Sequence, residues 1–141
     1  MSEPKRYRTF NRSSDLAVKI FGKSQGELFA NSGFALFDLL THIDRVEAKE
    51  NLTLEVEGAD RDDLMVNWMR ELLYLYQRSG YLLKDFVVKE VKDNYIRGEV
   101  GGEKFDPDRH EIQREISAVV SHQSRMEKTG DQWTAQVVLE L

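Results

Sequence analysis

The chain has 141 residues, a net charge of −5, three histidines and no cysteine. A chain of this length usually forms one domain, so we expect residues 1–141 to be a single domain. The lack of cysteine excludes disulfide bonds, thiolate metal ligands and cysteine nucleophiles. No apolar run is long enough to span a bilayer, and the first ten residues lack the apolar core of a signal peptide. We therefore expect a cytoplasmic protein with no membrane contact.

The acidic balance also bears on nucleic acids, because affinity for them comes from neutralising phosphates. Lys5, Arg6 and Arg8 form the one basic cluster that stands out, and we interpret it as a solvated N-terminal arm. We therefore expect no strong direct binding to RNA or DNA. Binding to a protein that handles nucleic acid stays open.

The first part of the chain predicts two strands and a helix. Residues 7–10 are consistent with a short edge strand, and residues 16–21 alternate enough to predict a strand that ends at Gly22. Ser24 and Glu27 have the spacing of a capping box. A helix is therefore expected over residues 25–42.

Residues 58–80 are the most strongly patterned segment and predict one amphipathic helix. Its apolar stripe consists of Leu64, Trp68, Leu72, Leu75 and Tyr76. Asp60 is the expected N-cap, and Gly80 is the expected end because glycine adopts a left-handed conformation without penalty. We interpret this helix as core scaffold.

The other periodic segments alternate with a period of two and predict strands. They are residues 51–57, 82–91, 95–100, a strand within 115–128, and 133–141. Turns are expected at 92–94 and 129–131, and Gly101 with Gly102 is expected to end the third of these strands. The order β-α-β-α-β-β-β-β predicts an α+β fold, with a largely antiparallel sheet and two long helices packed on one side.

The motifs of common catalytic sites are missing. The sequence has no phosphate-binding glycine loop, no HExxH and no serine nucleophile elbow, so we assign no catalytic residue. Carboxylates remain: Asp15 opens one strand, and Glu140 precedes the carboxyl-terminal Leu141. If those strands are neighbours, their oxygens suit a divalent ion such as Ca²⁺, Mg²⁺ or Mn²⁺. The alternative is a solvated pair at the ends of two strands.

Two further places are candidates for function. The segment GGEKFDPDRH carries Glu103, Asp106, Asp108 and His110 on a loop, where functional residues are often found, although charged loops are also simply solvated. His122 lies on an alternating strand. We interpret it as a packed or capping histidine, with contact to a partner as the alternative.

Taken in order, these segments resemble the archease family over residues 10–141. The matching segments are FNRSSDLAVKIFG, ELFANSGFALFDLL, EGADRDDLMVNWMRELLYL, the loop with Gly102, Glu103, Asp106 and His110, then ISAVVSH and QVVLEL. The resemblance implies an accessory protein that activates the tRNA-splicing RNA ligase, which joins RNA ends using a 3′-phosphate, GTP and Mn²⁺. Family members promote guanylylation of the ligase and multiple turnover and are not themselves catalysts of ligation. The resemblance also implies a divalent metal site at Asp15, Glu140 and the main-chain oxygen of Leu141.

The chain differs from the family pattern at three positions. Arg12 replaces a histidine three residues before Asp15, Ser117 replaces a lysine, and Glu140 replaces an aspartate. Arg12 and Ser117 favour an alternative in which an acidic binding or chaperone-like module serves a different protein partner. A small hydrolase that uses the GGEKFDPDRH loop is a third hypothesis.

Overall fold

The elements follow one another in the predicted order, preceded by the short edge strand that residues 7–10 suggested. The computed structural model describes residues 5–12 and 14–141, and the side chains of Arg12, His122 and Gln123 lie outside the described part. The elements are β1 (Tyr7–Arg12), β2 (Asp15–Gly22), α1 (Gln25–Leu40), the 3-10 helix η1 (Ile43–Arg45), β3 (Glu50–Glu57), α2 (Arg61–Ser79), β4 (Tyr81–Lys92), β5 (Tyr95–Lys104), β6 (Ala118–Thr129) and β7 (Gln132–Glu140). The α+β class is confirmed, and the edge strand expected at residues 7–10 is β1.

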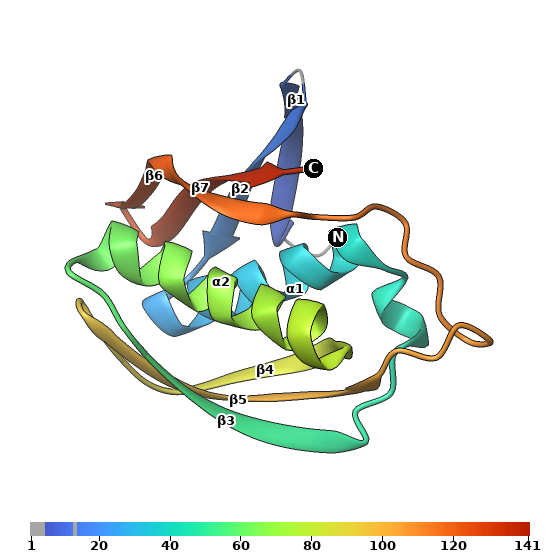
Figure 1. Cartoon of the computed structure of the whole chain (residues 1–141). Helices are drawn as coiled ribbons and strands as arrows, with labels where there is room; N and C mark the ends of the chain where they lie inside the picture. The colour runs from blue at the N-terminus through green and yellow to red at the C-terminus, as the bar shows by residue number, and fades with distance from the viewer. Residues whose placement is uncertain (1–4, 13) are drawn as a thin grey trace.

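The strands form two antiparallel sheets, where the sequence predicted one. The first has the order β1-β2-β7-β6 and the second the order β3-β5-β4. Figure 1 shows α1 and α2 lying between the two sheets, so each sheet packs one face on the helices. Alternation along a strand reports that one face is buried but does not identify the neighbouring strand. The sequence therefore predicted where in the chain the strands occur, but it did not predict that they divide into two sheets.

Both helices begin where local chemistry predicts, and α2 also ends there, whereas α1 ends at Leu40, two residues earlier than expected. The Asp60 side chain accepts a hydrogen bond from the N–H of Asp63, and Gly80 adopts the left-handed conformation with φ of 73°. At the start of α1, Ser24 accepts from the N–H of Glu27. The apolar faces of the helices meet in the core, where the Trp68 indole donates to the carbonyl of Phe29 across 3.1 Å. In the part of the chain that the structure describes, neither helix is long and apolar enough to cross a membrane.

Strand β5 runs through Gly101 and Gly102, so the expectation that these glycines end it was wrong. Gly102 pairs with Leu83 of β4. A Cβ atom on Gly102 would lie only 1.9 Å from the carbonyl oxygen of Leu82. Glycine, which has no Cβ atom, therefore allows the backbones of β4 and β5 to approach closely here, as glycines within strands often do. The continuation carries Glu103 into the last part of the strand.

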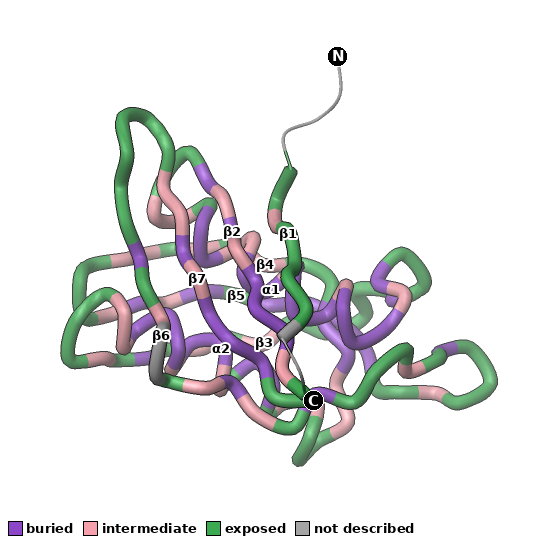
Figure 2. The backbone as a smooth tube through the Cα atoms, turned by 90° about the horizontal axis from the view of Figure 1, so that it is seen from above, coloured by how far each residue is buried: buried purple, intermediate pink, exposed green. Residues whose placement is uncertain are grey.

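The first sheet has a buried middle and an exposed edge. In Figure 2, β2 and β7 contain long buried stretches, whereas β1 is mostly exposed. The residues of β2 that enter the core are Leu16, Val18 and Ile20, and those of β7 are Ala135, Val137 and Leu139. The alternate residues of both strands point away from the helices.

Candidate functional site

Asp15 and Glu140 lie directly opposite each other on the adjacent strands β2 and β7. Side chains of such cross-strand partners project from the same face, with Cβ atoms about 4.5–5.5 Å apart. Asp15 is half-buried and Glu140 is exposed. Leu141 follows directly and is 49% exposed. The two strands are therefore neighbours, as the sequence-based idea of a shared site requires.

Ser117 fixes the end of β7 from the other side. Its N–H donates to the main-chain oxygen of Glu140 across 2.7 Å. Its hydroxyl lies 3.0 Å from the same oxygen and 3.4 Å from Oε1 of Glu140. Ala118, the next residue, is the partner of Glu140 on β6. The chain end is thus held between two strands, and a small polar residue contacts one of the two carboxylates.

These oxygens fit a hard divalent cation in type and fall short of a full ligand set. Among the side chains that the structure describes, which do not include that of His122, no three or more from His, Cys, Asp and Glu form a group able to hold a metal. In the predicted site, Asp15 and Glu140 would supply two carboxylates, and Leu141 would add a main-chain oxygen. Ca²⁺ takes about six to eight oxygen ligands, so water or a bound partner would complete the shell. Like charges opposite each other destabilise a strand pair, which a cation between them would relieve.

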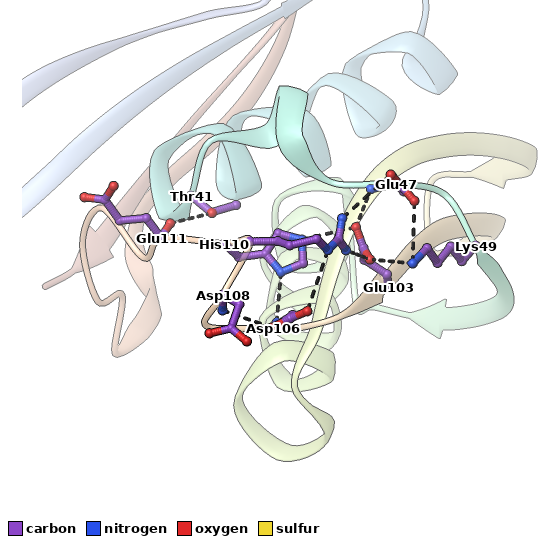
Figure 3. Close-up of polar contacts among 9 residues, drawn as sticks. Thr41, Glu47, Lys49, Glu103, Asp106, Asp108, His110 and Glu111 are labelled. Carbon is purple, nitrogen blue, oxygen red and sulfur yellow. Dashed lines mark hydrogen bonds and ion pairs between the residues drawn. The ribbon is translucent and has the colours of Figure 1, made fainter.

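A second polar cluster surrounds Glu103 at the end of β5 (Figure 3). Glu103 is only 4% exposed. Its Oε2 accepts from the N–H of Glu47 at 2.6 Å and contacts Nε2 of His110 at 3.1 Å. Its Oε1 contacts the Arg109 guanidinium and lies 3.5 Å from Nζ of Lys49. Two N–H donors and two cations therefore enclose this carboxylate.

The pKa of Glu103 reflects this enclosure. Burial raises the pKa, whereas the hydrogen bonds from the Glu47 N–H and from His110, together with the charge of Arg109, lower it more. The net result is a pKa below the ordinary value for glutamate. A carboxylate stabilised in this way is a weak base, so it is poorly suited to general-base catalysis.

The loop that follows folds back on itself through His110. The N–H of Asp106 donates to Nδ1 of His110 at 2.9 Å, and the N–H of His110 donates to the carbonyl of Asp106 at 2.7 Å. Asp106 also accepts from the N–H of Asp108 at 2.9 Å. The structure brings Glu103, Asp106 and His110 together, but it places Glu103 in β5 and not on the predicted loop, and it buries both Glu103 and His110. The contacts describe an anchored loop, and they give the hydrolase hypothesis no support.

Sequence reasoning did not identify the partners of Glu103. Glu47 and Lys49 come from the segment between η1 and β3, which has no periodicity that would assign it to a site. Arg109 stands beside His110 in the sequence, and its charge was the one available signal. His122 lies in β6 within a register shift between Val120 and Arg125, and its side chain lies outside the described residues. Its predicted contact with a partner stays a prediction.

The carboxylate pair and the Glu103 cluster occur in a chain with clear relatives. The Archease protein family (MTH1598/TM1083) matches residues 7–141. "Protein archease" of Methanopyrus kandleri is 33% identical over 96% of this chain and 99% of its own length. "Protein archease" of Pyrococcus furiosus is 34% identical over 97% of this chain and 99% of its own length.

Solved structures agree with this relationship. The solution structure of Methanobacterium thermoautotrophicum protein 1598 superposes with a TM-score of 0.80 at 26% identity, covering 96% of this chain and 99% of that one. The crystal structure of a Thermotoga maritima protein, described as "an archease, possible chaperone", shares the fold with a TM-score of 0.65 at 18% identity, covering 100% of this chain and 98% of that one. With a family match over nearly the whole chain and relatives above 30% identity, this chain belongs to the archease family.

Proposed function

We propose that this protein is an accessory factor that activates a tRNA-splicing RNA ligase dependent on GTP and Mn²⁺, by promoting ligase guanylylation and multiple turnover. Membership of the archease family supports this proposal. The protein acts in it through a partner and carries no catalytic residue of its own. Action on another protein is also consistent with the description of the Thermotoga maritima protein as a possible chaperone.

The observation that carries the proposal is the pairing of Asp15 with Glu140. Two carboxylates that share one face at a sheet end, beside the exposed Leu141, form a site that a docked protein can reach. Their incomplete ligand set leaves positions for groups supplied by a partner or its nucleotide. A divalent ion bound there would supply positive charge for phosphate groups during guanylate transfer.

The roles of the residues follow from their positions. Asp15 and Glu140 would hold the ion from opposite strands, and the Leu141 main-chain oxygen would add a third donor. Ser117 would orient Glu140, since its hydroxyl contacts Oε1 at 3.4 Å and its N–H fixes the neighbouring carbonyl. Replacing the lysine of the family pattern with this serine places a neutral donor beside the carboxylate.

The test is RNA ligation under multiple-turnover conditions with the cognate ligase, GTP and Mn²⁺, with and without this protein. We expect a large rise in turnover that is lost with Asp15→Ala and with Glu140→Ala. Glu57→Ala is the matched control, because Glu57 is also an exposed glutamate that ends a strand, in the other sheet. Full stimulation by a folded Asp15→Ala protein would refute the role of the site. No stimulation by the wild-type protein would leave a different protein partner as the function to test.

A further inference from the structure

The outer face of the first sheet combines cations with aromatic rings. Lys19 and Phe21 of β2 alternate with the core residues of that strand and so point away from the helices. Arg8 of β1 lies directly opposite Lys19. Figure 1 shows both helices on the other side of this sheet. No described helix or strand therefore covers Arg8, Lys19 and Phe21.

Short contacts show that these side chains form one surface. The guanidinium carbon of Arg8 lies 5.2 Å from the centre of the Phe10 ring and 5.8 Å from that of Phe21. Nζ of Lys19 lies 6.0 Å from the Phe21 ring centre. Phe10 is 45% exposed, which is high for so large an apolar side chain. We call Arg8, Phe10, Lys19 and Phe21 the basic–aromatic face.

The row of Arg8 and Lys19 continues across the sheet. Gln136 of β7 is the partner of Lys19, and Arg125 of β6 is the partner of Gln136. Arg125 is engaged by Glu127 at 2.6 Å. The argument therefore rests on Arg8 and Lys19, with Gln136 as a neutral polar neighbour.

The charge of the chain is divided unevenly. Residues 5–23 contain six Lys or Arg and one Asp, a net charge of +5. Because the whole chain carries −5, the rest of it carries −10. Of the basic residues that looked like a solvated arm in the sequence, Arg8 lies in β1 opposite Lys19, and the carbonyl of Arg6 accepts from the N–H of Phe21 at 2.9 Å. An acidic protein thus carries a segment of net positive charge at this hairpin and its flanking residues.

A hollow extends this surface toward the start of α1. Its volume is about 470 Å³, and Phe21 is part of its wall. Lys5, Arg6, Lys23, Asn31 and Gln132 line it with polar groups, and Glu27 and Gly22 complete it. Hollows of about 300–1,000 Å³ accommodate small molecules, so this one has room for a nucleotide.

We propose that the basic–aromatic face binds single-stranded RNA. Arg8 and Lys19 pair with backbone phosphates, and bases stack on Phe10 and Phe21. Rings beside cations on an open sheet face are a common way to hold single strands, because every base has a face that can stack. A duplex would leave the rings unused, since its bases are already stacked. The choice of RNA over DNA rests on the proposed function, and the inference revises the expectation of no strong direct nucleic-acid binding.

The experiment measures binding of a 5′-labelled 12-nucleotide U RNA to the full-length protein by fluorescence anisotropy, without ligase or divalent ion, at several KCl concentrations. We expect the double variant Arg8→Glu/Lys19→Glu to weaken binding at least tenfold. The logarithm of the binding constant falls linearly with the logarithm of the salt concentration, and each phosphate contact to a single strand contributes about 0.7 to this slope. The loss of two phosphate contacts should therefore lower the magnitude of the slope by about 1.4. Phe21→Leu keeps an apolar side chain and should weaken binding about fivefold without changing the slope.

The matched control is Arg97→Glu/Lys89→Glu, which makes the same charge change in the second sheet at partly exposed residues. We expect it to change affinity less than twofold. Loss of binding in the control equal to that in the test variant would overturn the proposal, as would absence of binding by the wild-type protein. Tighter binding of the matching dT oligonucleotide would overturn the choice of RNA. If Arg8→Glu/Lys19→Glu kept its affinity for RNA but no longer bound the ligase, the proposal would be overturned and the basic–aromatic face would be a contact with the ligase protein.

The two proposals can fail separately. RNA binding is measured on the protein alone, whereas activation is measured as turnover of the ligase. A wild-type protein that binds U RNA but does not stimulate ligation would contradict the activator role and leave the RNA-binding face intact. A wild-type protein that stimulates ligation without binding RNA would contradict the inference about this face.

Discussion

His110 donates a hydrogen bond from Nε2 to Oε2 of Glu103 across 3.1 Å. The direction follows from the opposite side of the ring, where Nδ1 accepts from the N–H of Asp106 and therefore carries no proton in the neutral imidazole. The bond joins the end of β5 to the loop seven residues later. Because the carboxylate also accepts from the N–H of Glu47, it ties that loop to the segment before β3.

This arrangement predicts that Glu103→Gln destabilises the fold. The variant keeps the shape of the side chain but loses the negative charge that Arg109 and the N–H donors contact. We therefore expect the free energy of unfolding to fall by about 1–3 kcal/mol at pH 7. The lowered pKa of Glu103 sets the sign of the pH dependence. Its contribution is present above the ordinary glutamate value of 4.5 and is lost as the pH falls through the lower folded-state value.

Urea unfolding at pH 7 and at pH 3 tests this. The difference between wild type and Glu103→Gln should shrink at pH 3, below the ordinary glutamate value of 4.5, because the contribution of the charged carboxylate falls as the pH drops toward its lower folded-state pKa. Glu99→Gln is the control, since Glu99 is exposed on the same strand and its ion pair with Lys89 spans 3.7 Å. It should change stability by less than about 0.5 kcal/mol. A pH-independent difference for Glu103→Gln would contradict the account.

Gly102 and Gly101 form a matched pair for testing the close approach of β4 and β5. In Gly102→Ala the new Cβ would meet the Leu82 carbonyl oxygen at 1.9 Å, so backbones must separate. In Gly101→Ala the nearest atom, at 2.8 Å, is Oδ1 of Asn51, the end of an exposed side chain that can move. We expect a loss above about 3 kcal/mol for the first and below about 1 kcal/mol for the second. Thermal unfolding followed by circular dichroism measures both, and similar melting temperatures would count against the tight backbone contact.

The features predicted correctly from the sequence are those set by neighbouring residues. Asp60 and Gly80 bound α2 because a cap and a left-handed glycine act within one turn. Ser24 begins α1 for the same reason. The partition into two sheets depends instead on which strands meet, and alternation contains no such information. Gly101 and Gly102 misled the prediction because glycine serves both strand ends and close backbone contacts.

The same distinction applies to the candidate sites, because each depends on residues that are distant in the sequence. The sequence identified Asp15 and Glu140 as candidates, but only the register of β2 with β7 establishes that they are partners. The basic–aromatic face escaped notice, because Arg8 precedes Lys19 by eleven residues and meets it only across the hairpin. The enclosure of Glu103 likewise needs Lys49 and Arg109 from distant segments. The sequence shows which residue types are present, but only the fold shows which of these residues lie close together.

Trp68 connects the two helices, and its loss should be costly. Its side chain is 1% exposed, and its ring meets that of Phe29 edge-on with centres 6.4 Å apart. Trp68→Phe removes the bond to the Phe29 carbonyl and leaves a cavity, so we expect a loss of about 2–4 kcal/mol. Trp133→Phe is the control: Trp133 is half-buried and stacks with Arg61 at 5.1 Å, and the change should cost less than about 1 kcal/mol. Guanidinium unfolding compares the two, and equal losses would contradict the connecting role of Trp68.

The proposed divalent site predicts opposite effects of one substitution with and without metal. Without metal, Asp15→Asn removes a charge that faces Glu140, so the variant should be at least as stable as the wild type. With Ca²⁺ or Mn²⁺ at a hundred times the dissociation constant, linkage should stabilise the wild type by about 2.7 kcal/mol. Asp15→Asn should lose that gain, whereas Glu57→Gln should keep it. Thermal unfolding over a metal titration measures both effects. An equal rise in melting temperature for wild type and Asp15→Asn would place metal binding elsewhere, and no rise in the wild type would show that these oxygens need a partner to complete the site.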